Sequence, residues 1–589
     1  MYPRIVRVRD RHGTPVEYVR LVESYREGKR VKQRIVAHLG RKDVLAEHLD
    51  RLLELLRGPR ESTPDVSTLE AHSAAAWGPV LVARHLWTQL GLDEVIRCLC
   101  TPPQRQYDIA DLAFVLVASR LCRPSSEHAL AWWLEEAYVC TREGCRFLPQ
   151  WERTRRVRIA FRQLYLWYRT LDALLAKKAE IEQAIYFHLR DLFSLRVQIA
   201  FYDLTSTFFE GRGPEELGRH GYSRDHRPRE KQILVGVVMV NGWPIAHHVF
   251  RGNLQDHQTV VTVLADLRER FGLQQVAFVG DRGMASQAVL AWLEQEQIPY
   301  LVGLQRRRRP EVTTLIEGAQ GEWIPCPLSQ GAREKTPSPV TYVQEVERDG
   351  SGRRYFVVRS DERLEYERTL REKAMARVEA QLKDLQRQVT EGKLKKREVI
   401  GARAQAILSH HHGHRYFAWK LDEAGGFHYF EHPVNLPREK ALEGKYVLQA
   451  SRLDLDPVGV VAAYKELAQV EHGFRHLKDV IALRPVYHQT DHRVQGHVFV
   501  AALAFLLLRA LERGLREQGV DLGAEEALQS LETIRVVEFE AHGAKHQVVT
   551  RPSTHAALVL KALGIKLTKP PSSDKAAVAS VVPKAKTRS

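Results

Sequence analysis

Two short apolar stretches, each running into an aspartate, constrain the fold of this chain more than any other feature. Residues 197–202 lead into Asp203, and residues 275–280 lead into Asp281. Both stretches are rich in apolar and β-branched residues, which is typical of buried strands. An ionised carboxylate at such a strand end costs free energy unless a cation or a donor meets it. Taken alone, Asp203 can equally be a turn former that caps the next segment.

The segments around the two acids predict that both strands belong to one mixed sheet. In order, the sequence predicts strands over 233–240 and 245–250, helices over 256–271 and 286–295, and a strand over 300–304. Asn241-Gly242 between the first two strands is a strong hairpin-turn signal. The connections are short enough for one sheet. The order makes the strands of Asp203 and Asp281 neighbours, so the two acids are expected to meet.

A third acid lies on a helix that is predicted to begin near Pro457. Tyr464, Glu471 and Lys478 are each seven residues apart. On an α-helix, residues seven apart differ in direction around the axis by only about 20°, so these three are expected to share one helix face. A coiled-coil stripe is the alternative, but such a stripe would place apolar residues at these positions.

Three acids on two strands and a helix need a cation if they are to lie together unprotonated. Asp203, Asp281 and Glu471 offer only oxygen ligands, which favours Mg²⁺ or Mn²⁺ over zinc. Two such ions can activate a water or a 3′-hydroxyl and stabilise the leaving oxygen of a phosphodiester. The residues therefore predict metal-assisted phosphoryl transfer on a nucleic acid.

The overall charge supports a polyanionic partner. Among 589 residues, 88 are Lys or Arg and 72 are Asp or Glu, which gives a net charge of +16 and a pI of about 9.5. This favours DNA or RNA ahead of a membrane surface, although a generally basic proteome is the alternative. The apolar run 498–508 is too short to span a bilayer. The six cysteines lack C-x-x-C spacing and are interpreted as reduced core residues of a cytosolic protein.

The length of the rest of the chain predicts several further domains. Residues 18–39 form a hairpin whose basic face either follows phosphates or is simply solvated. The sequence also predicts a helix over 45–56, a linker over 58–67, and helices over 109–121, 129–138 and 155–175. Strands are predicted over 341–347, 353–359, 427–430 and 445–449, with a charged helical stretch over 362–408 that is broken near Gly392. Two last strands, over 535–539 and 546–549, are predicted to add a sheet edge. The histidine run 410–414 does not converge on one ion, and the tail from Lys569 is expected to be disordered.

These features together resemble the RNase H-like core of DDE transposases from bacterial insertion sequences. The helix is similar to the Tyr-x2-Arg-x3-Glu-x6-Lys signature of one class, with Leu467 where the signature has Arg. The likeness extends to 202–207, to Asp225-His-Arg-Pro, to Gly252-Asn253, to 280–283 and to the basic N-terminal hairpin. It covers roughly residues 1–510.

The resemblance implies an α/β fold, in which a mixed catalytic sheet is interrupted by a β-rich and helical insertion. It implies that Asp203, Asp281 and Glu471 bind two Mg²⁺ or Mn²⁺ ions. Tyr464 and Lys478 would hold phosphates of the transposon ends, and Arg475 could replace the missing Arg; further candidate DNA contacts are Arg227 and Arg282. The expected domains are 1–70 (hairpin and helix), 71–195 (helical, DNA-binding), 196–305 (first part of the core), 306–455 (insertion), 456–567 (second part of the core) and 568–589 (tail).

The favoured hypothesis is a cut-and-paste transposase acting on double-stranded DNA in a bacterial cytoplasm. It would bind terminal inverted repeats, cleave at the ends and join the 3′-hydroxyls to target DNA, as a homodimer that synapses two ends. The alternatives are a nuclease of the same fold without strand transfer and a catalytically silent DNA-binding protein.

Overall fold

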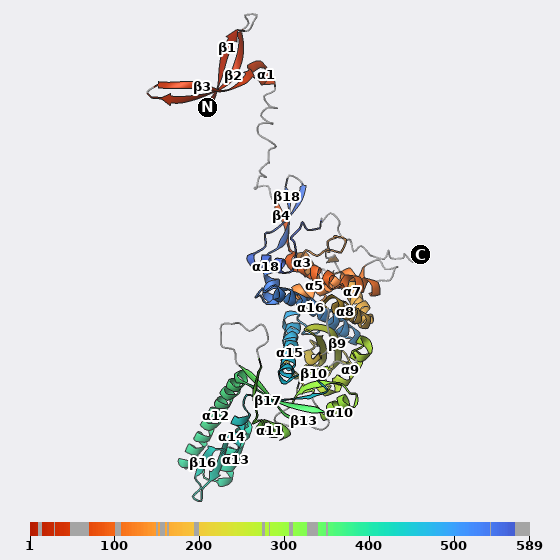
Figure 1. Cartoon of the computed structure of the whole chain (residues 1–589), viewed down its shortest axis with the longest axis vertical. Helices are drawn as coiled ribbons and strands as arrows, with labels where there is room; N and C mark the ends of the chain where they lie inside the picture. The colour runs from red at the N-terminus through yellow and green to blue at the C-terminus, as the bar shows by residue number, and fades with distance from the viewer. Residues whose placement is uncertain are drawn as a thin grey trace, which may run out of the picture. The chain divides into compact units, whose positions relative to one another are not determined.

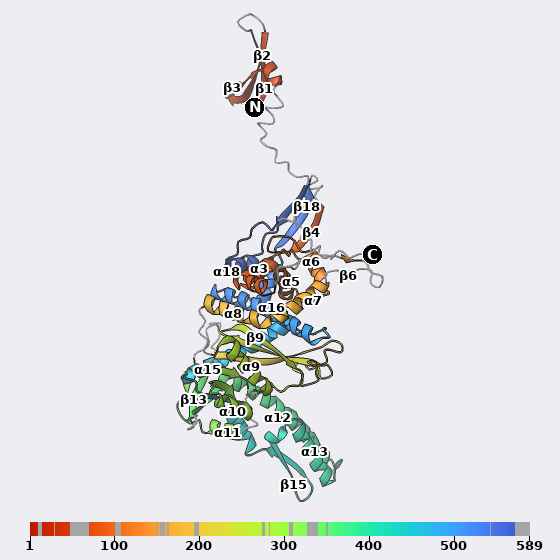
Figure 2. The ribbon, with the colours of Figure 1, turned by 90° about the vertical axis from the view of Figure 1, so that its right-hand side faces the viewer.

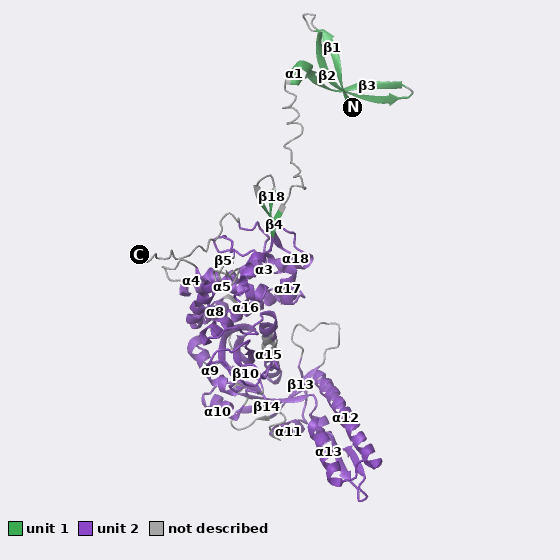
Figure 3. Cartoon of the chain, turned by 180° about the vertical axis from the view of Figure 1, so that it is seen from behind, with its two compact units in different colours: residues 1–73, 537–548 green, residues 74–536, 549–589 purple. Residues whose placement is uncertain are grey.

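The computed structural model divides the chain into two compact units, residues 1–73 with 537–548 and residues 74–536 with 549–589 (Figure 3). It describes residues 1–9, 15–28, 30–47, 70–100, 108–148, 151–152, 160–161, 164–193, 199–273, 277–281, 283–284, 286–304, 310–326, 340–348, 352–541 and 544–571. Within these ranges a few side chains, that of Glu471 among them, lie outside the description.

The smaller unit begins with a three-stranded antiparallel sheet. Its elements are β1 (Tyr2–Arg9), β2 (Pro15–Glu27), β3 (Arg30–Arg41) and α1 (Lys42–Glu47). The predicted hairpin is confirmed as β2–β3, and β1 adds a strand that the sequence did not predict. Part of its basic face is paired, as in the Arg34–Glu23 ion pair. The helix begins earlier than predicted; its expected continuation and the linker over 58–67 lie outside the described residues.

A nine-stranded mixed sheet is the centre of the larger unit (Figure 1). Its order is β12-β13-β14-β17-β11-β10-β7-β8-β9. The strands that form the core are β7 (Ile199–Phe208), β8 (Gln232–Val240), β9 (Trp243–Arg251), β10 (Ala277–Gly280) and β11 (Tyr300–Gly303). The first three are antiparallel, whereas β7, β10 and β11 run parallel. This arrangement confirms the expected RNase H-like α/β core.

Turn and capping residues in the sequence explain several element boundaries of this core. Asn241 and Gly242 both have positive φ, at 49° and 79°, as the tight turn between β8 and β9 requires. Helix α9 (Asp256–Phe271) connects β9 to β10, and α10 (Gln287–Gln295) connects β10 to β11. The hydroxyl of Ser286 accepts a hydrogen bond from the backbone N–H of Val289 and so caps α10.

Asp203 does not end its strand as the sequence predicted. β7 continues to Phe208, and its second half pairs with β8 from Leu204↔Gly236 to Phe208↔Gln232. Thr205, Ser206 and Thr207, which follow Asp203 within β7, all have buried side chains. Threonine tolerates a buried strand position well, since it is β-branched.

The segment predicted as an insertion extends the central sheet. β12 (Ile324–Cys326), β13 (Thr341–Arg348), β14 (Arg353–Ser360) and β17 (Lys445–Ser451) continue the sheet beyond β11. A smaller hydrophobic core lies between α12 (Asp361–Thr390), α13 (Arg397–His410), β15 (Phe417–Leu421), β16 (Phe427–Glu431) and α14 (Asn435–Leu442). The two long helices lie side by side (Figure 2). The break predicted near Gly392 is confirmed, with φ of 71° at that residue.

The helical region shares one hydrophobic core with the sheet. Its helices are α3 (Gly78–Gln89), α4 (Leu92–Cys100), α5 (Ile109–Cys122), α6 (Leu130–Glu136), α7 (Leu164–Ala176) and α8 (Lys178–Phe193). The helix predicted from residue 155 starts only at Leu164, because Ala160–Phe161 (β6) pairs with Trp151–Glu152 (β5). Five basic residues of this region, which was expected to bind DNA, lie outside the described residues; they are Arg153, Arg155, Arg156, Arg158 and Arg162.

The C-terminal helices complete the larger unit. α15 (Pro457–Arg475) precedes α16 (Asp491–Glu517), and α17 (Ala524–Leu531) and α18 (Thr554–Ala562) follow. α16 contacts α5, α7 and β9 (Figures 1 and 2). It is longer than the predicted apolar run, and within the described residues it alone is long and apolar enough to cross a membrane. Its apolar window is 89% buried inside the protein, so α16 is a core helix.

Two further expectations are wrong. β18 (Arg535–Ala541) and β19 (Ala544–Val549) do not extend the central sheet; they form a separate three-stranded sheet with β4 (Glu70–Ala76). The cysteines are free thiols, but not all of them are core residues, since Cys98 is exposed. The tail beyond residue 571 lies outside the described residues.

Candidate active site

Asp203 projects from one identifiable face of the central sheet. Its neighbour Tyr202 points to the α9 face, where the phenol donates a 2.8 Å hydrogen bond to Thr259 Oγ1. Successive side chains of a strand point to opposite faces. Asp203 therefore projects from the face opposite α9. It is partly buried, and its Oδ1 accepts a 2.7 Å hydrogen bond from the backbone N–H of Leu204.

Asp281 directly follows β10, the parallel neighbour of the strand that carries Asp203. β10 pairs with β7 in the register Val279↔Phe201. Asp203 lies two residues beyond Phe201 in β7, and Asp281 lies two residues beyond Val279, directly after β10 ends at Gly280. Neighbouring strands are about 4.8 Å apart. The parallel pairing thus places the two predicted aspartates at corresponding positions of two neighbouring chain segments.

The helix that carries Glu471 covers this face. Met239 of β8 pairs with Phe201 and so projects on the Asp203 side of the sheet. A Cβ on Gly473 would lie 3.7 Å from Met239 Sδ, which places α15 against that side. α15 also contacts β7 and β10. The backbone of Glu471 is two residues from this contact, and its side chain lies outside the described atoms.

The predicted common face of Tyr464, Glu471 and Lys478 is not formed, because the α-helix ends at Arg475. Residues His476–Val480 form a π-helical turn, η3. The backbone N–H of Ile481 donates to the His476 carbonyl at 2.9 Å, an i→i+5 bond. A wider turn changes the angular advance per residue, so spacing by seven no longer returns Lys478 to the Glu471 face.

Lys478 is instead held in a buried ion pair. Its Nζ donates to Asp225 Oδ1 at 2.8 Å, and the side chains are only 11% and 3% exposed. Arg484 Nη1 donates to the same oxygen, and its Nη2 donates to Asp479 at 2.6 Å. Burial lowers the pKa of Lys478, although the hydrogen bond that Lys478 donates to Asp225 opposes this shift. The sequence had not predicted this role for Asp225 or Arg484; Asp225-His-Arg-Pro was its only signal.

The other predicted DNA contacts differ in accessibility. Tyr464 is partly buried, with its ring centroid 6.1 Å from that of Tyr446. Arg475 is exposed at the end of α15. Arg227 is also exposed and lies over the ring of Phe208, 5.5 Å from its centroid. Arg282 lies outside the described residues.

Leu467, at the position of the signature Arg, belongs to the hydrophobic core. Its side chain is 3% exposed and packs in the main cluster. A charged guanidinium at this position would be buried, which costs several kcal/mol without a partner. The departure from the signature therefore agrees with the packing of α15.

A second cluster of titratable groups lies between the helical region and the chain after α15. Glu127, His488 and His497 are buried and bring possible ligand atoms within 4.8 Å of one another. The guanidinium of Arg120 lies among them, 3.7 Å from Glu127 Oε1 and 3.2 Å from His497 Nδ1. A permanently charged guanidinium here repels a metal ion and already neutralises the carboxylate. We therefore assign this cluster as a structural ion pair.

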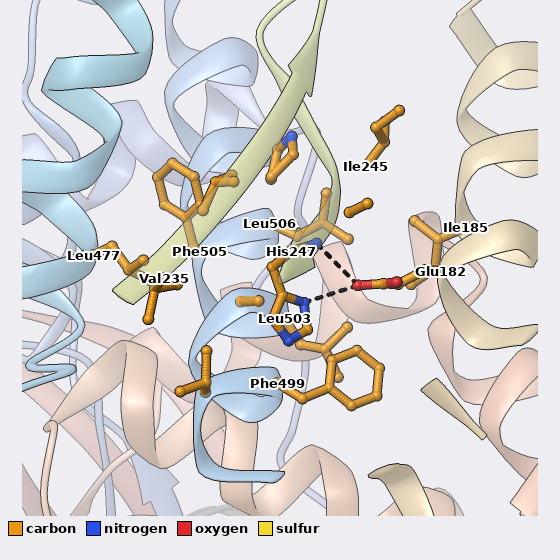
Figure 4. A pocket seen from close by; sticks show the side chains of 15 residues that line it. Glu182, Ile185, Val235, Ile245, His247, Leu477, Phe499, Leu503, Phe505 and Leu506 are labelled. Carbon is orange, nitrogen blue, oxygen red and sulfur yellow. Dashed lines mark hydrogen bonds and ion pairs between the residues drawn. The ribbon is translucent and has the colours of Figure 1, made fainter. Parts of the chain in front are cut away.

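A small cavity beside β9 is also structural (Figure 4). Its volume is about 30 Å³, which is room for a single water. Glu182 reaches His247 Nδ1 at 2.8 Å and accepts from the His247 backbone N–H at 3.1 Å, as the dashed lines in Figure 4 mark. Lys178 and Arg270 also bind Glu182, each at 2.8 Å. This network joins α8 to β9 and α9.

The donor set at the sheet face fits a divalent cation. Asp203 lies in β7 and Asp281 directly follows its neighbour β10, and α15, whose sequence includes Glu471, packs against both strands. Oxygen donors of this kind are those that hard cations such as Mg²⁺ prefer. The arrangement can bind metal ions next to a phosphodiester.

Comparison with known proteins gives the class of this chain. Residues 199–507 match the family described as Transposase DDE domain. The match spans more than half of the sequence, so the chain belongs to the DDE transposase family. It is a transposase, an enzyme of DNA cleavage and strand transfer that depends on divalent metal ions, with DNA as its partner.

The N-terminal region narrows this assignment. Residues 4–63 match the N-terminal domain of IS1634 family transposases, so the chain is an insertion-sequence transposase. No curated protein matches the sequence. Among solved structures it is similar to a piggyBac transposase in a synaptic complex with hairpin DNA, at 9% identity, with 77% of this chain and 79% of that chain covered. The TM-score of 0.31 is too low for that likeness to carry an argument.

Proposed function

We propose that this transposase binds the terminal inverted repeats of its element, cleaves at the ends and joins the 3′-hydroxyls to target DNA. The observation that supports the proposal is the parallel pairing of β7 with β10, which lead through and into the two aspartates, together with the packing of α15 against the sheet. We further propose that it works as a homodimer in a bacterial cytoplasm, since two ends have to be held together.

Asp203, Asp281 and Glu471 are the proposed metal ligands, and Mg²⁺ or Mn²⁺ the proposed metal, with two ions. When bound, such ions activate the attacking hydroxyl and stabilise the leaving oxygen. The task of the chain is to hold three carboxylates at one place. The sheet fixes the two aspartates relative to each other, and α15 supplies the glutamate from a separate part of the sequence.

The proposed DNA contacts lie near α15 and the loop after β7. Arg475 and Arg227 are exposed cations on these two segments, and Tyr464 and Arg282 complete the set. Arg475 replaces the cation that the signature places at Leu467. Each lost charge–phosphate contact is expected to weaken binding by about 1–3 kcal/mol.

The proposal is tested with purified protein and a plasmid that carries the two ends of the element. With Mg²⁺ or Mn²⁺ we expect cleavage at the ends and joined products. With Ca²⁺ we expect binding at most. Cleavage that survives exhaustive chelation would refute the metal assignment. Cleavage without joined products would instead favour a nuclease, and metal-independent binding alone would favour a silent DNA-binding protein.

A further inference from the structure

The signature lysine of this class lies inside the protein, in contact with an acid from another segment. We propose that Lys478 is a positioning residue and that Asp225 clamps the chain after α15 to the loop after β7. The inference rests on the proposed function for its consequence in catalysis. The clamp itself is a property of the folded chain without DNA.

The burial of the pair argues against direct contact of Lys478 with a phosphate. Asp225 has 3% of its side chain exposed, and its Oδ1 accepts from both Lys478 and Arg484. A phosphate would have to displace a carboxylate that is already buried and charge-matched. Asp225 Oδ2 is also buried and has no hydrogen-bond partner among the described residues.

Neighbouring contacts show what the clamp holds. The chain after η3 pairs with the end of β7: the Val486 N–H donates to the Phe208 carbonyl, and the Val486 carbonyl accepts from the Glu210 N–H, both at 3.0 Å. In the same loop as Asp225, the backbone N–H of Arg224 donates to Ser206 Oγ at 3.1 Å. β7 carries Asp203, and α15 carries Glu471 immediately before η3. The clamp therefore joins the strand of one proposed metal ligand to the helix of another.

The first experiment separates positioning from phosphate binding by the salt dependence of end binding. Each phosphate contact adds about 0.9 to the slope of log K against log salt. We expect Lys478→Ala to keep the wild-type slope, whereas Arg475→Ala, the exposed control at the end of α15, lowers it by about 1. A slope lowered by about 1 in Lys478→Ala would overturn the proposal.

The second measurement is the cleavage rate at saturating DNA. We expect Lys478→Ala to lower kcat by about 100-fold, as a displacement of about 1 Å of a catalytic group does, with little change in KM. Lys478→Arg should restore kcat, since its guanidinium can pair with the same carboxylate. A purely phosphate-binding lysine would instead raise KM, and that outcome would refute the inference.

Thermal unfolding without DNA tests the clamp independently of the proposed function. Lys478→Ala and Asp225→Asn should each lower Tm, and the double variant should lose less than the sum of the two, because both remove the same pair. Strictly additive losses would refute the clamp. A wild-type protein that binds no DNA would refute the proposed function, and these melts would still decide whether Asp225 and Lys478 act together.

Discussion

Gly473 of α15 lies directly against Phe505 of α16, so that a Cβ on Gly473 would come within 2.8 Å of Phe505 Cζ. This contact sets how closely α15, the helix of Glu471, packs against α16. We expect Gly473→Ala to push α15 away, to cost about 1–3 kcal/mol of stability and to slow DNA cleavage. Phe505→Leu should partly restore both in the double variant, whereas Ala462→Ser on an exposed position of α15 should change neither. Wild-type cleavage by Gly473→Ala would contradict this view of the helix.

Glu471→Gln tests the third carboxylate while keeping its shape. Folding and end binding should persist, and cleavage should fall by several orders of magnitude, because the amide no longer contributes a charged ligand. Stabilisation by added Mg²⁺, measured as the shift in Tm, should also shrink. Without metal, Tm should hold or rise slightly, since repulsion among three acids is relieved.

The matched controls for this variant are Glu466→Gln and Asp479→Asn, which remove nearby acids of the same chain segment. Both should retain cleavage. If Glu471→Gln cleaves and joins DNA at the wild-type rate, the third ligand is misassigned, and these two acids become the next candidates.

The sequence was a good guide to the strands that carry or precede the two aspartates because their signals are local. Apolar strands, the Asn241-Gly242 turn and the short connections together determine which strands are neighbours. The exact place of Asp203 within β7 was missed, since pairing with β8 keeps a run of hydroxyl residues in the strand. Tertiary pairing here overrides a local turn signal.

The region after Glu471 was the least predictable part of the site. Spacing by seven assumes a continuous α-helix, and η3 ends that continuity at His476. No local sequence signal predicts the π-helical turn. The partner of Lys478 is Asp225, 253 residues earlier in the chain. Contacts at such separation depend on the whole fold.

Restoring the signature arginine is expected to harm this protein. Leu467 is 3% exposed in the main core, so Leu467→Arg would bury an unpaired charge at a cost of about 3–5 kcal/mol. Leu467→Met conserves volume and should cost less than about 1.5 kcal/mol. Denaturant unfolding of both variants measures the difference. A Leu467→Arg protein as stable as the wild type and with tighter end binding would show that this position faces DNA.

Acid destabilisation should report the buried histidines. Burial, together with the charge of Arg120, lowers the pKa of His497 to about 4 from an ordinary value of 6.5, against the opposing effect of Glu127. Above pH 6.5 the imidazole is neutral in both the folded and the unfolded states. Between pH 6.5 and 4, His497 is protonated in the unfolded chain but stays neutral in the folded chain. The free energy of unfolding therefore falls as the pH falls. Below pH 4 this contribution is constant.

The slope from one such group is at most about 1.4 kcal/mol per pH unit. His247, whose pKa burial also lowers to about 4, adds a similar contribution over the same range. His497→Asn keeps an acceptor for Arg120 and removes the titrating group, so the free energy of unfolding should depend less steeply on pH between 4 and 6.5. The exposed His220→Asn is the control and should leave the slope unchanged. Equal slopes in His497→Asn and the wild type would mean that protonation of His497 does not destabilise the folded state. The Arg120–Glu127 cluster would then tolerate a second positive charge.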